Sequence, residues 1–100
     1  MDKYSVKIMP KAARDIDEIY TYLVKEKEVP EIALNLVDVL EDTILSLENL
    51  PYRGSERKTG AFVNKGYRQI FAKNFTIVYC IDEKRHFVII ITVRYSPSKF

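Results

Sequence analysis

Hydrophobic and polar positions alternate at the start of the chain, and the period then lengthens. Tyr4, Val6 and Ile8 alternate with Ser5, Lys7 and Met9, and a period of two predicts a short strand. Pro10 ends that strand and suits the first turn of a helix. From Lys11 to Lys25 the apolar residues recur every three or four positions, which predicts an amphipathic helix. The apolar residues of this helix are Ala12, Ile16, Ile19, Tyr20 and Leu23.

A second helical pattern follows the polar segment KEKEVP. Pro30 suits its first turn, and Glu31 places a negative charge where the helix dipole favours one. Pro51 follows shortly after the pattern ends and fits a stop signal. The core stripe consists of Ala33, Leu36, Val37, Leu40, Ile44 and Leu47, whereas Leu34, Val39 and Leu45 lie off it. The apolar face is therefore wider than a two-layer domain requires. Cover by the first helix is the simpler explanation, and a partner's helix is the alternative.

The second half of the chain predicts a loop and three strands. Residues 52–66 hold all three glycines and several cations, which indicates a loop with a short edge strand around Ala61–Val63. The strands expected after it are Tyr67–Lys73, Phe75–Ile81 and His86–Tyr95, and their β-branched and aromatic residues support this assignment. The predicted class is α+β: an N-terminal strand, a helical hairpin and then a three-stranded antiparallel meander, all in an antiparallel sheet.

The last two predicted strands are apolar on both faces. Phe75, Ile77 and Tyr79 lie on one face, and Val78 and Cys80 lie on the other. Strands of this kind are usually central and covered on both sides. The helical hairpin covers one side, so the other side again points to a partner.

Composition places the chain among ordinary globular domains and excludes several classes. With 100 residues, 47% hydrophobic and 30% charged, we expect one domain over residues 1–100 and no disordered tail. The stretch Phe87–Val93 is far shorter than the ~20 residues of a membrane span, and the first residues carry no secretory signal. One Cys and one His exclude an internal disulfide and a structural zinc. We therefore expect a protein of the reducing cytoplasm with no metal and no cofactor.

Charge divides the chain into two unlike halves. The net charge of +2 is the sum of about −5 in residues 1–50 and about +7 in residues 51–100. This asymmetry suggests a basic surface for an anionic partner. The alternative is a pair of acidic helices beside a solvated basic sheet.

The usual catalytic signatures are absent from the sequence. It contains no GxSxG, P-loop, HExxH or dinucleotide fingerprint. His86 is interpreted as a surface histidine and Cys80 as a buried, inert thiol, because no cation is adjacent to lower its pKa. The carboxylates of the helices are expected to face solvent, which argues against a catalytic acid pair.

Basic and aromatic residues of the strands remain as candidates. Arg68 and Arg94 lie within predicted strands, where each is either an exterior residue or a bidentate ligand for a phosphate. Tyr67, Tyr95 and Phe71 are close enough in sequence to stack on a base, and they are equally well explained as core or rim aromatics. For Phe71 we expect a place in the core.

The sequence resembles the RelE/ParE superfamily of bacterial type II toxins over essentially its whole length. PKAARDIDEIYTYL is similar to the "A..DL..I..Y" opening helix of ParE-like members. The connector PYRG and the run GYRQIFAKNFTIVYCID…VIIITVRY complete the likeness. The resemblance implies a growth-inhibiting toxin, neutralised by a cognate antitoxin that docks on Leu34, Val39 and Leu45, with operator DNA contacted only through the antitoxin.

Two targets follow from the two branches of the superfamily. A RelE- or YoeB-like toxin is a metal-free endonuclease of ribosome-bound mRNA, which implies catalytic roles for Arg68, Arg94 and Tyr95. A ParE-like toxin poisons DNA gyrase and needs no such set. In either case the residues expected to bind the target or a nucleic acid are Arg57, Lys58, Lys65, Arg68 and Lys73.

Departures from the nuclease pattern favour the ParE-like branch. The chain ends in SPSKF without the terminal tyrosine of RelE- and YoeB-like toxins, and no His follows Arg94–Tyr95. Glu56 is only a loose match to the acidic residue that YoeB-like toxins use as a base. We therefore expect a gyrase-directed toxin, with the mRNA endonuclease as the alternative and a degenerate, antitoxin-binding copy as a third hypothesis.

Overall fold

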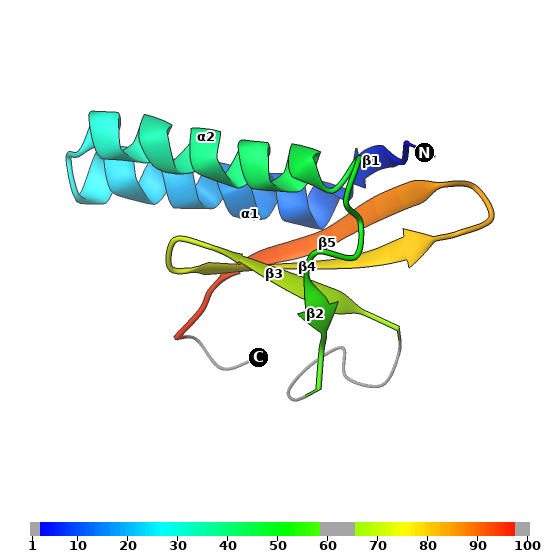
Figure 1. Ribbon diagram of the computed structural model, residues 1–100. Coiled ribbons are helices and arrows are strands. Elements are labelled where there is room, and N and C mark those ends of the chain that lie inside the picture. Colours follow the sequence, from blue (N-terminus) through cyan, green and yellow to red (C-terminus); the bar gives the residue numbers. More distant parts are fainter. Residues whose placement is uncertain (1–2, 59–65, 98–100) are drawn as a thin grey trace.

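The computed structural model describes residues 3–58 and 66–97 (Figure 1). The expected order of strand, helical hairpin and three-stranded meander is confirmed, whereas the expected edge strand at Ala61–Val63 lies outside the described residues. One short strand, Ser55–Glu56, was not predicted. The elements are β1 (Ser5–Ile8), α1 (Pro10–Thr21), η1 (Tyr22–Glu26), α2 (Pro30–Ser46), β2 (Ser55–Glu56), β3 (Arg68–Ala72), β4 (Phe75–Asp82) and β5 (Phe87–Tyr95).

The two helices form a hairpin on one face of the sheet (Figure 1). Both begin at a proline, which is favoured in the first turn because that position needs no backbone donor. η1 continues α1 as a π-helical turn, and Glu28, with φ 54°, then reverses the chain before Pro30. The reversal lays α2 alongside α1.

The sheet is mixed and has the strand order β1-β5-β4-β3-β2. β3, β4 and β5 pair antiparallel, as expected for the meander. β1 pairs parallel with β5, from Ser5 beside Phe87 to Ile8 beside Ile90, so the expectation of an antiparallel sheet is wrong at this edge. The parallel pairing needs a long connection between the strands, and the hairpin and meander supply it.

The core lies between the helices and the sheet. Each large aliphatic side chain buried there contributes about 1.5–3 kcal/mol. Val39 packs partly buried against this core, so its expected place off the core stripe is wrong, whereas Leu34 and Leu45 are 55% and 52% exposed. The buried core residues are Ala12, Leu40, Ile44, Leu47, Ile70, Ala72, Ile77, Tyr79, Val88, Ile90 and Val93.

The sheet face opposite the helices departs from two expectations. Phe71 is 59% exposed there and does not enter the core, because it points away from Ile70 and Ala72 on the same strand. Val78 is fully buried within the single chain, so a partner is not needed to cover it. Over residues 3–58 and 66–97, no helix is both long enough and apolar enough to cross a membrane.

Candidate functional site

The residues expected to act together fall at two ends of the sheet. Arg68 begins β3 and pairs with Tyr79, whereas Tyr95 ends β5 and pairs with Phe75. Tyr79 and Phe75 are four positions apart along β4, which is about 13 Å of strand. We name the Arg68 end, with residues 51–54, the connector end. The Tyr95 end, with the β3–β4 turn and the residues around it, is the groove end.

At the connector end, Arg68 is held by the backbone of the loop that follows α2. One guanidinium nitrogen donates to the carbonyl of Gly54 at 2.6 Å and to that of Tyr52 at 3.3 Å. The guanidinium carbon lies 5.0 Å from the centre of the Tyr52 ring. The Nε atom is buried and makes no hydrogen bond with the residues that the structure describes. This geometry gives Arg68 a structural role in the connector.

Tyr79 holds the same loop from inside the core. Its hydroxyl donates to the Pro51 carbonyl at 2.8 Å and accepts from the Gly54 N–H at 3.2 Å. A Cβ atom added to Gly54 would lie 2.2 Å from the Gln69 carbonyl oxygen and 2.7 Å from the Tyr79 hydroxyl. Close backbone approach therefore requires glycine at this position, which explains the final residue of PYRG.

Two further candidate cations lie beside the connector end. Arg57 follows β2 and donates from its guanidinium to the side-chain oxygen of Gln69 at 2.9 Å. Lys58 is exposed. Lys65 lies outside the described residues. Glu56 is opposite Arg68 in the β2–β3 register, so a carboxylate and an arginine are neighbours here, but Tyr95 is not with them.

At the groove end, a groove of about 1050 Å³ lies between the helices and the end of the sheet. Phe75 and Tyr95 form its aromatic wall, with ring centres 5.7 Å apart in an edge-to-face contact, and Tyr95 is 49% exposed. The groove is lined by the apolar or aromatic residues Ile19, Tyr22, Leu23, Ile32, Leu36, Phe75, Val93 and Tyr95, and by Lys11, Asp15, Glu18, Asn35, Lys73, Asn74 and Arg94.

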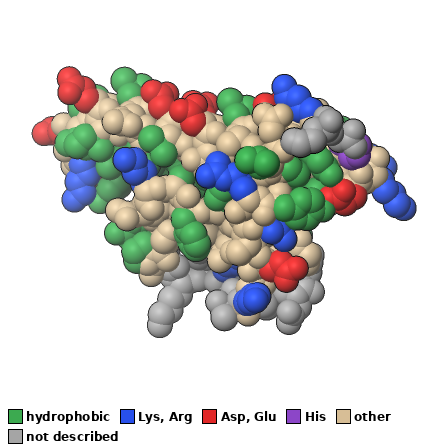
Figure 2. Space-filling model, in the orientation of Figure 1, with side chains coloured by type: hydrophobic (Ala, Val, Ile, Leu, Met, Phe, Trp, Pro, Cys, Tyr) green, Lys and Arg blue, Asp and Glu red, His purple; other side chains and the backbone are tan. Residues whose placement is uncertain are grey.

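Charges are unevenly distributed around the molecule. Figure 2 shows acidic side chains gathered along the helical side, where Glu31, Asp38, Glu41 and Asp42 are exposed. Three cations line the groove below the helices, Lys11, Lys73 and Arg94, against two carboxylates. The cations of the predicted basic sheet thus lie in two groups, one at the groove end and one at the connector end.

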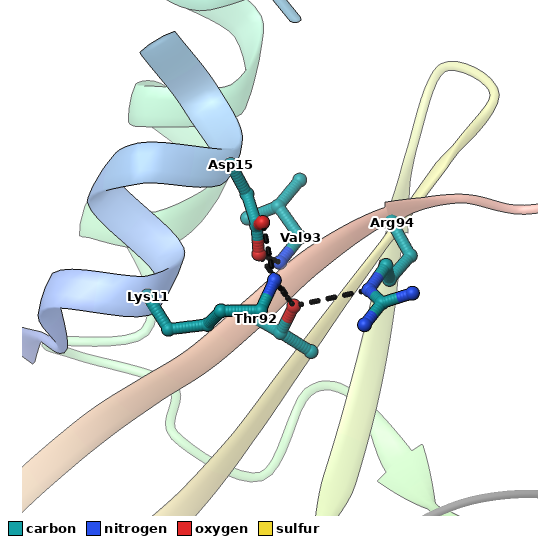
Figure 3. Close-up of polar contacts among 5 residues, drawn as sticks. All are labelled: Lys11, Asp15, Thr92, Val93 and Arg94. Carbon is teal, nitrogen blue, oxygen red and sulfur yellow. Dashed lines mark hydrogen bonds and ion pairs between the residues drawn. The ribbon is translucent and has the colours of Figure 1, made fainter. Parts of the chain in front are cut away.

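Asp15 is buried in the wall of the groove, contrary to the expectation that helical carboxylates face solvent (Figure 3). It accepts hydrogen bonds from the Thr92 hydroxyl and from the Val93 N–H, the latter at 3.1 Å, and it pairs with Lys11. Asp15 is buried because it lies on the core stripe of α1, three residues after Ala12 and four before Ile19. That spacing, with Lys11 one turn earlier, is the sequence signal that could have identified it.

The electrostatics of Asp15 are dominated by its partners. Burial alone would raise the pKa of this carboxyl. The hydrogen bonds from Lys11, Thr92 and Val93, together with the charge of Lys11, outweigh burial and hold the pKa below its usual value. Asp15 is therefore a carboxylate throughout the neutral range.

The two single-copy residues, His86 and Cys80, are both half-buried. Burial and the nearby charge of Asp82 raise the pKa of the Cys80 thiol, which agrees with an inert cysteine. His86 packs its ring 4.9 Å from the ring of Tyr4 and has φ 57°. It was expected at the surface, but its place in the β4–β5 turn against β1 covers part of it.

Comparisons with known proteins agree on one fold. The chromosomal ParDE toxin–antitoxin system of P. aeruginosa contains a chain with 23% identity and a TM-score of 0.73, covering 95% of this chain and 98% of that one. A chain of the RelBE2 toxin–antitoxin complex of Mycobacterium tuberculosis has 21% identity and a TM-score of 0.66, covering 95% of this chain and 93% of that one. A mutant of the E. coli toxin RelE in the free state has 10% identity and a TM-score of 0.62, covering 94% of this chain and 84% of that one. No curated protein matches the sequence.

The sequence itself matches one family over most of its length. Residues 6–97 match the ParE toxin of the type II toxin–antitoxin system parDE, a range that runs from β1 past the end of β5. Both the connector end and the groove end lie within it. The chain therefore belongs to the ParE toxin family, and its partner is an antitoxin.

Proposed function

We propose that this toxin inhibits DNA gyrase in the cytoplasm, without nuclease activity, until its cognate antitoxin neutralises it. One observation carries the proposal: the residues that a nuclease would need are divided between the two ends of the sheet. Arg68 belongs to the connector end, whereas Lys73, Arg94 and Tyr95 belong to the groove end.

Metal-free RNA cleavage by the 2′-hydroxyl makes strict geometric demands. A proton acceptor must reach the 2′-hydroxyl, a proton donor must reach the leaving oxygen, and a cation must reach the phosphate between them, each within hydrogen-bond distance. The donors of Arg68 are directed to the connector carbonyls, and about 13 Å of strand separates its register position from that of Tyr95. Glu56 lies beside Arg68 without that tyrosine. The arrangement supports the gyrase-directed branch over the endonuclease.

The groove is the proposed docking site for the antitoxin. Its apolar floor and three cations suit an amphipathic segment that carries acidic side chains. Leu34 and Leu45, exposed on the outer face of α2, are proposed as a second contact. Val39 is excluded because it packs against the core. Operator DNA would then be contacted by the antitoxin, and Arg57 and Lys58 remain candidates for target contacts at the connector end.

The test is a supercoiling assay with purified gyrase. Purified toxin is expected to block supercoiling or to trap cleaved DNA, and prior addition of antitoxin should restore activity. Primer extension on mRNA from induced cells should show no new ends. Gyrase that stays fully active at excess toxin would contradict the proposal, and codon-linked mRNA cuts lost in Arg68→Ala and Tyr95→Phe would establish the endonuclease instead.

A further inference from the structure

The outer edge of β5 loses its neighbouring strand halfway along. β1 ends at Ile8, opposite Ile90, and the Met9 N–H makes the last bond to this edge, at 3.0 Å from the Ile90 carbonyl oxygen. The register of β4 and β5 shifts next to this point, where Val78 pairs with Thr92 and Tyr79 with Ile90, leaving Ile91 as the extra residue. Thr92 and Val93 therefore follow at an edge where β1 is no longer present.

A carboxylate replaces the missing strand at this edge. The Val93 N–H would otherwise be a buried donor without a partner, which is unfavourable, and Asp15 accepts from it at 3.1 Å. The same carboxylate accepts from the Thr92 hydroxyl and pairs with Lys11. Figure 3 shows the carboxylate of α1 directed at the backbone and side chain of β5.

Thr92 links Asp15 to Arg94 through two hydrogen bonds of its hydroxyl. Because the Thr92 hydroxyl donates its only proton to Asp15, its lone pairs are left as acceptors. The Thr92 hydroxyl oxygen accepts hydrogen bonds from Lys11 Nζ and from Arg94 Nε, each at 3.4 Å. Thr92 is itself buried, so the direction of its hydroxyl is set by Asp15 and not by solvent. Arg94 and Lys11 are two of the three cations that line the groove.

We propose that Asp15 is the positioning residue of the groove: it caps the free edge of β5 and, through Thr92, orients Arg94 toward an acidic segment of the partner. The docking half of this inference rests on the proposed function, and the orientation of Arg94 does not. Asp15 itself does not contact the partner's carboxylates. Its charge is balanced by the ion pair with Lys11 and by the hydrogen bonds from Thr92 and Val93.

The orientation is tested by NMR on the full-length free toxin. Asp15→Asn should shift the Arg94 Nε–H signal and should speed hydrogen exchange of the Val93 amide at least tenfold. Thr92→Val should shift the Arg94 signal as well, and Thr92→Ser should restore it because the hydroxyl is kept. Asp17→Asn is the matched control, since it makes the same change of charge at an exposed position of α1. An Arg94 Nε–H signal unchanged in both Asp15→Asn and Thr92→Val would overturn the inference.

The docking half is tested by affinity for the purified cognate antitoxin. Thr92→Val should weaken binding about tenfold in the wild-type background and less than twofold in an Arg94→Ala background. An equal loss in both backgrounds would mean that Thr92 acts only through stability, which overturns the docking half. If Phe75→Ala leaves affinity unchanged, the groove is not the docking site and the proposed function fails at that point. The NMR signals still decide the positioning role in that case.

Discussion

The connector end and the groove end use the same residue types in opposite ways. Each has an arginine and a tyrosine: Arg68 and Tyr79 pair across β3 and β4, whereas Arg94 and Tyr95 are consecutive residues of β5. At the connector end Tyr79 is fully buried and Arg68 donates to two backbone carbonyls. At the groove end Tyr95 is half-exposed, and Arg94 reaches the side chain of Thr92 beside a groove.

The two arginines differ in the partners that hold them. Backbone carbonyls fix the guanidinium of Arg68 in one arrangement, because the connector is itself held by Tyr79 and by the close approach of Gly54. Arg94 is oriented by side chains along a wall that a ligand can approach. Variants of the two ends should therefore differ: connector variants lower stability, whereas variants of the exposed groove residue Tyr95 lower affinity.

Gly54→Ala should give the largest effect. The added Cβ would overlap the Gln69 carbonyl oxygen, so we expect a loss of about 3 kcal/mol in the free energy of unfolding, measured by urea denaturation. Gly66→Ala is the control, because no atom of the described residues lies within 4 Å of its Cβ, and its φ of 76° adds strain of about 1–2 kcal/mol. Equal losses in the two variants would contradict the close packing of the connector.

Tyr79→Phe should lower the free energy of unfolding by about 2 kcal/mol, because the Pro51 carbonyl loses its donor and the Gly54 N–H loses its acceptor. Thermal unfolding measures this, as a fall in Tm of roughly 8–16 °C for a domain of this size. Tyr95→Phe is the counterpart at the groove end and should change stability by less than about 0.5 kcal/mol. A similar fall in Tm for both would erase the distinction between the two ends.

Asp15→Asn should cost about 1.5 kcal/mol at neutral pH, because a charged acceptor of three hydrogen bonds is lost. The pKa of Asp15 is lowered in the folded protein. Its stabilisation is therefore complete above the ordinary Asp pKa of about 4 and declines as the pH falls through the lower folded value.

The pH dependence of the Asp15→Asn difference can be followed by urea denaturation between pH 7 and pH 2. Lys11, Glu18, Lys73 and Arg94 are the other charged groups lining this part of the groove, and they are unchanged in the variant. Asp17→Asn should show no such difference. A gap between wild type and Asp15→Asn that widens as the pH falls would have the wrong sign.

Tyr95→Ala should have the smallest effect on stability, below about 1 kcal/mol, because it removes one edge-to-face ring contact from a half-exposed side chain. Its effect on the antitoxin should be large by comparison, with affinity reduced about tenfold in calorimetric titrations. Arg68→Lys gives the reverse test. It should lower stability and leave affinity within twofold, and a selective loss of affinity there would move the docking site to the connector end.

Local pattern was sufficient to predict the two α-helices and the strands β1, β3, β4 and β5 but not β2 or η1, because helix period, strand period and proline positions are properties of neighbouring residues. The partners of Asp15 were not predictable in this way, since Thr92 and Val93 lie 77 and 78 positions later in the chain. The division of Arg68 from Tyr95 depends likewise on the register of β3, β4 and β5. Arg68 was correctly placed in a strand, but its partners in the connector come from the loop after α2.

Exposure of individual side chains was also decided by tertiary context. Phe71 has the character of a core residue but lies on the face opposite the helices. Val39 was expected off the core stripe and packs, partly buried, against the core. In both cases the helix or strand was predicted correctly. Which face of it would be covered by the rest of the fold could not be predicted from the local sequence.

The parallel pairing of β1 with β5 also determines how late in synthesis the sheet and its groove can form. Ser5 pairs with Phe87, 82 positions later, so this contact forms late and contributes to slow folding. A chain emerging from the ribosome has its helical hairpin long before it has β5. Because the groove needs Arg94 and Tyr95, nascent chains lack it until synthesis has passed β5. The contact proposed for the antitoxin in the groove would then form only with toxin molecules whose sheet has closed, and unfinished chains would offer it only the α2 contact.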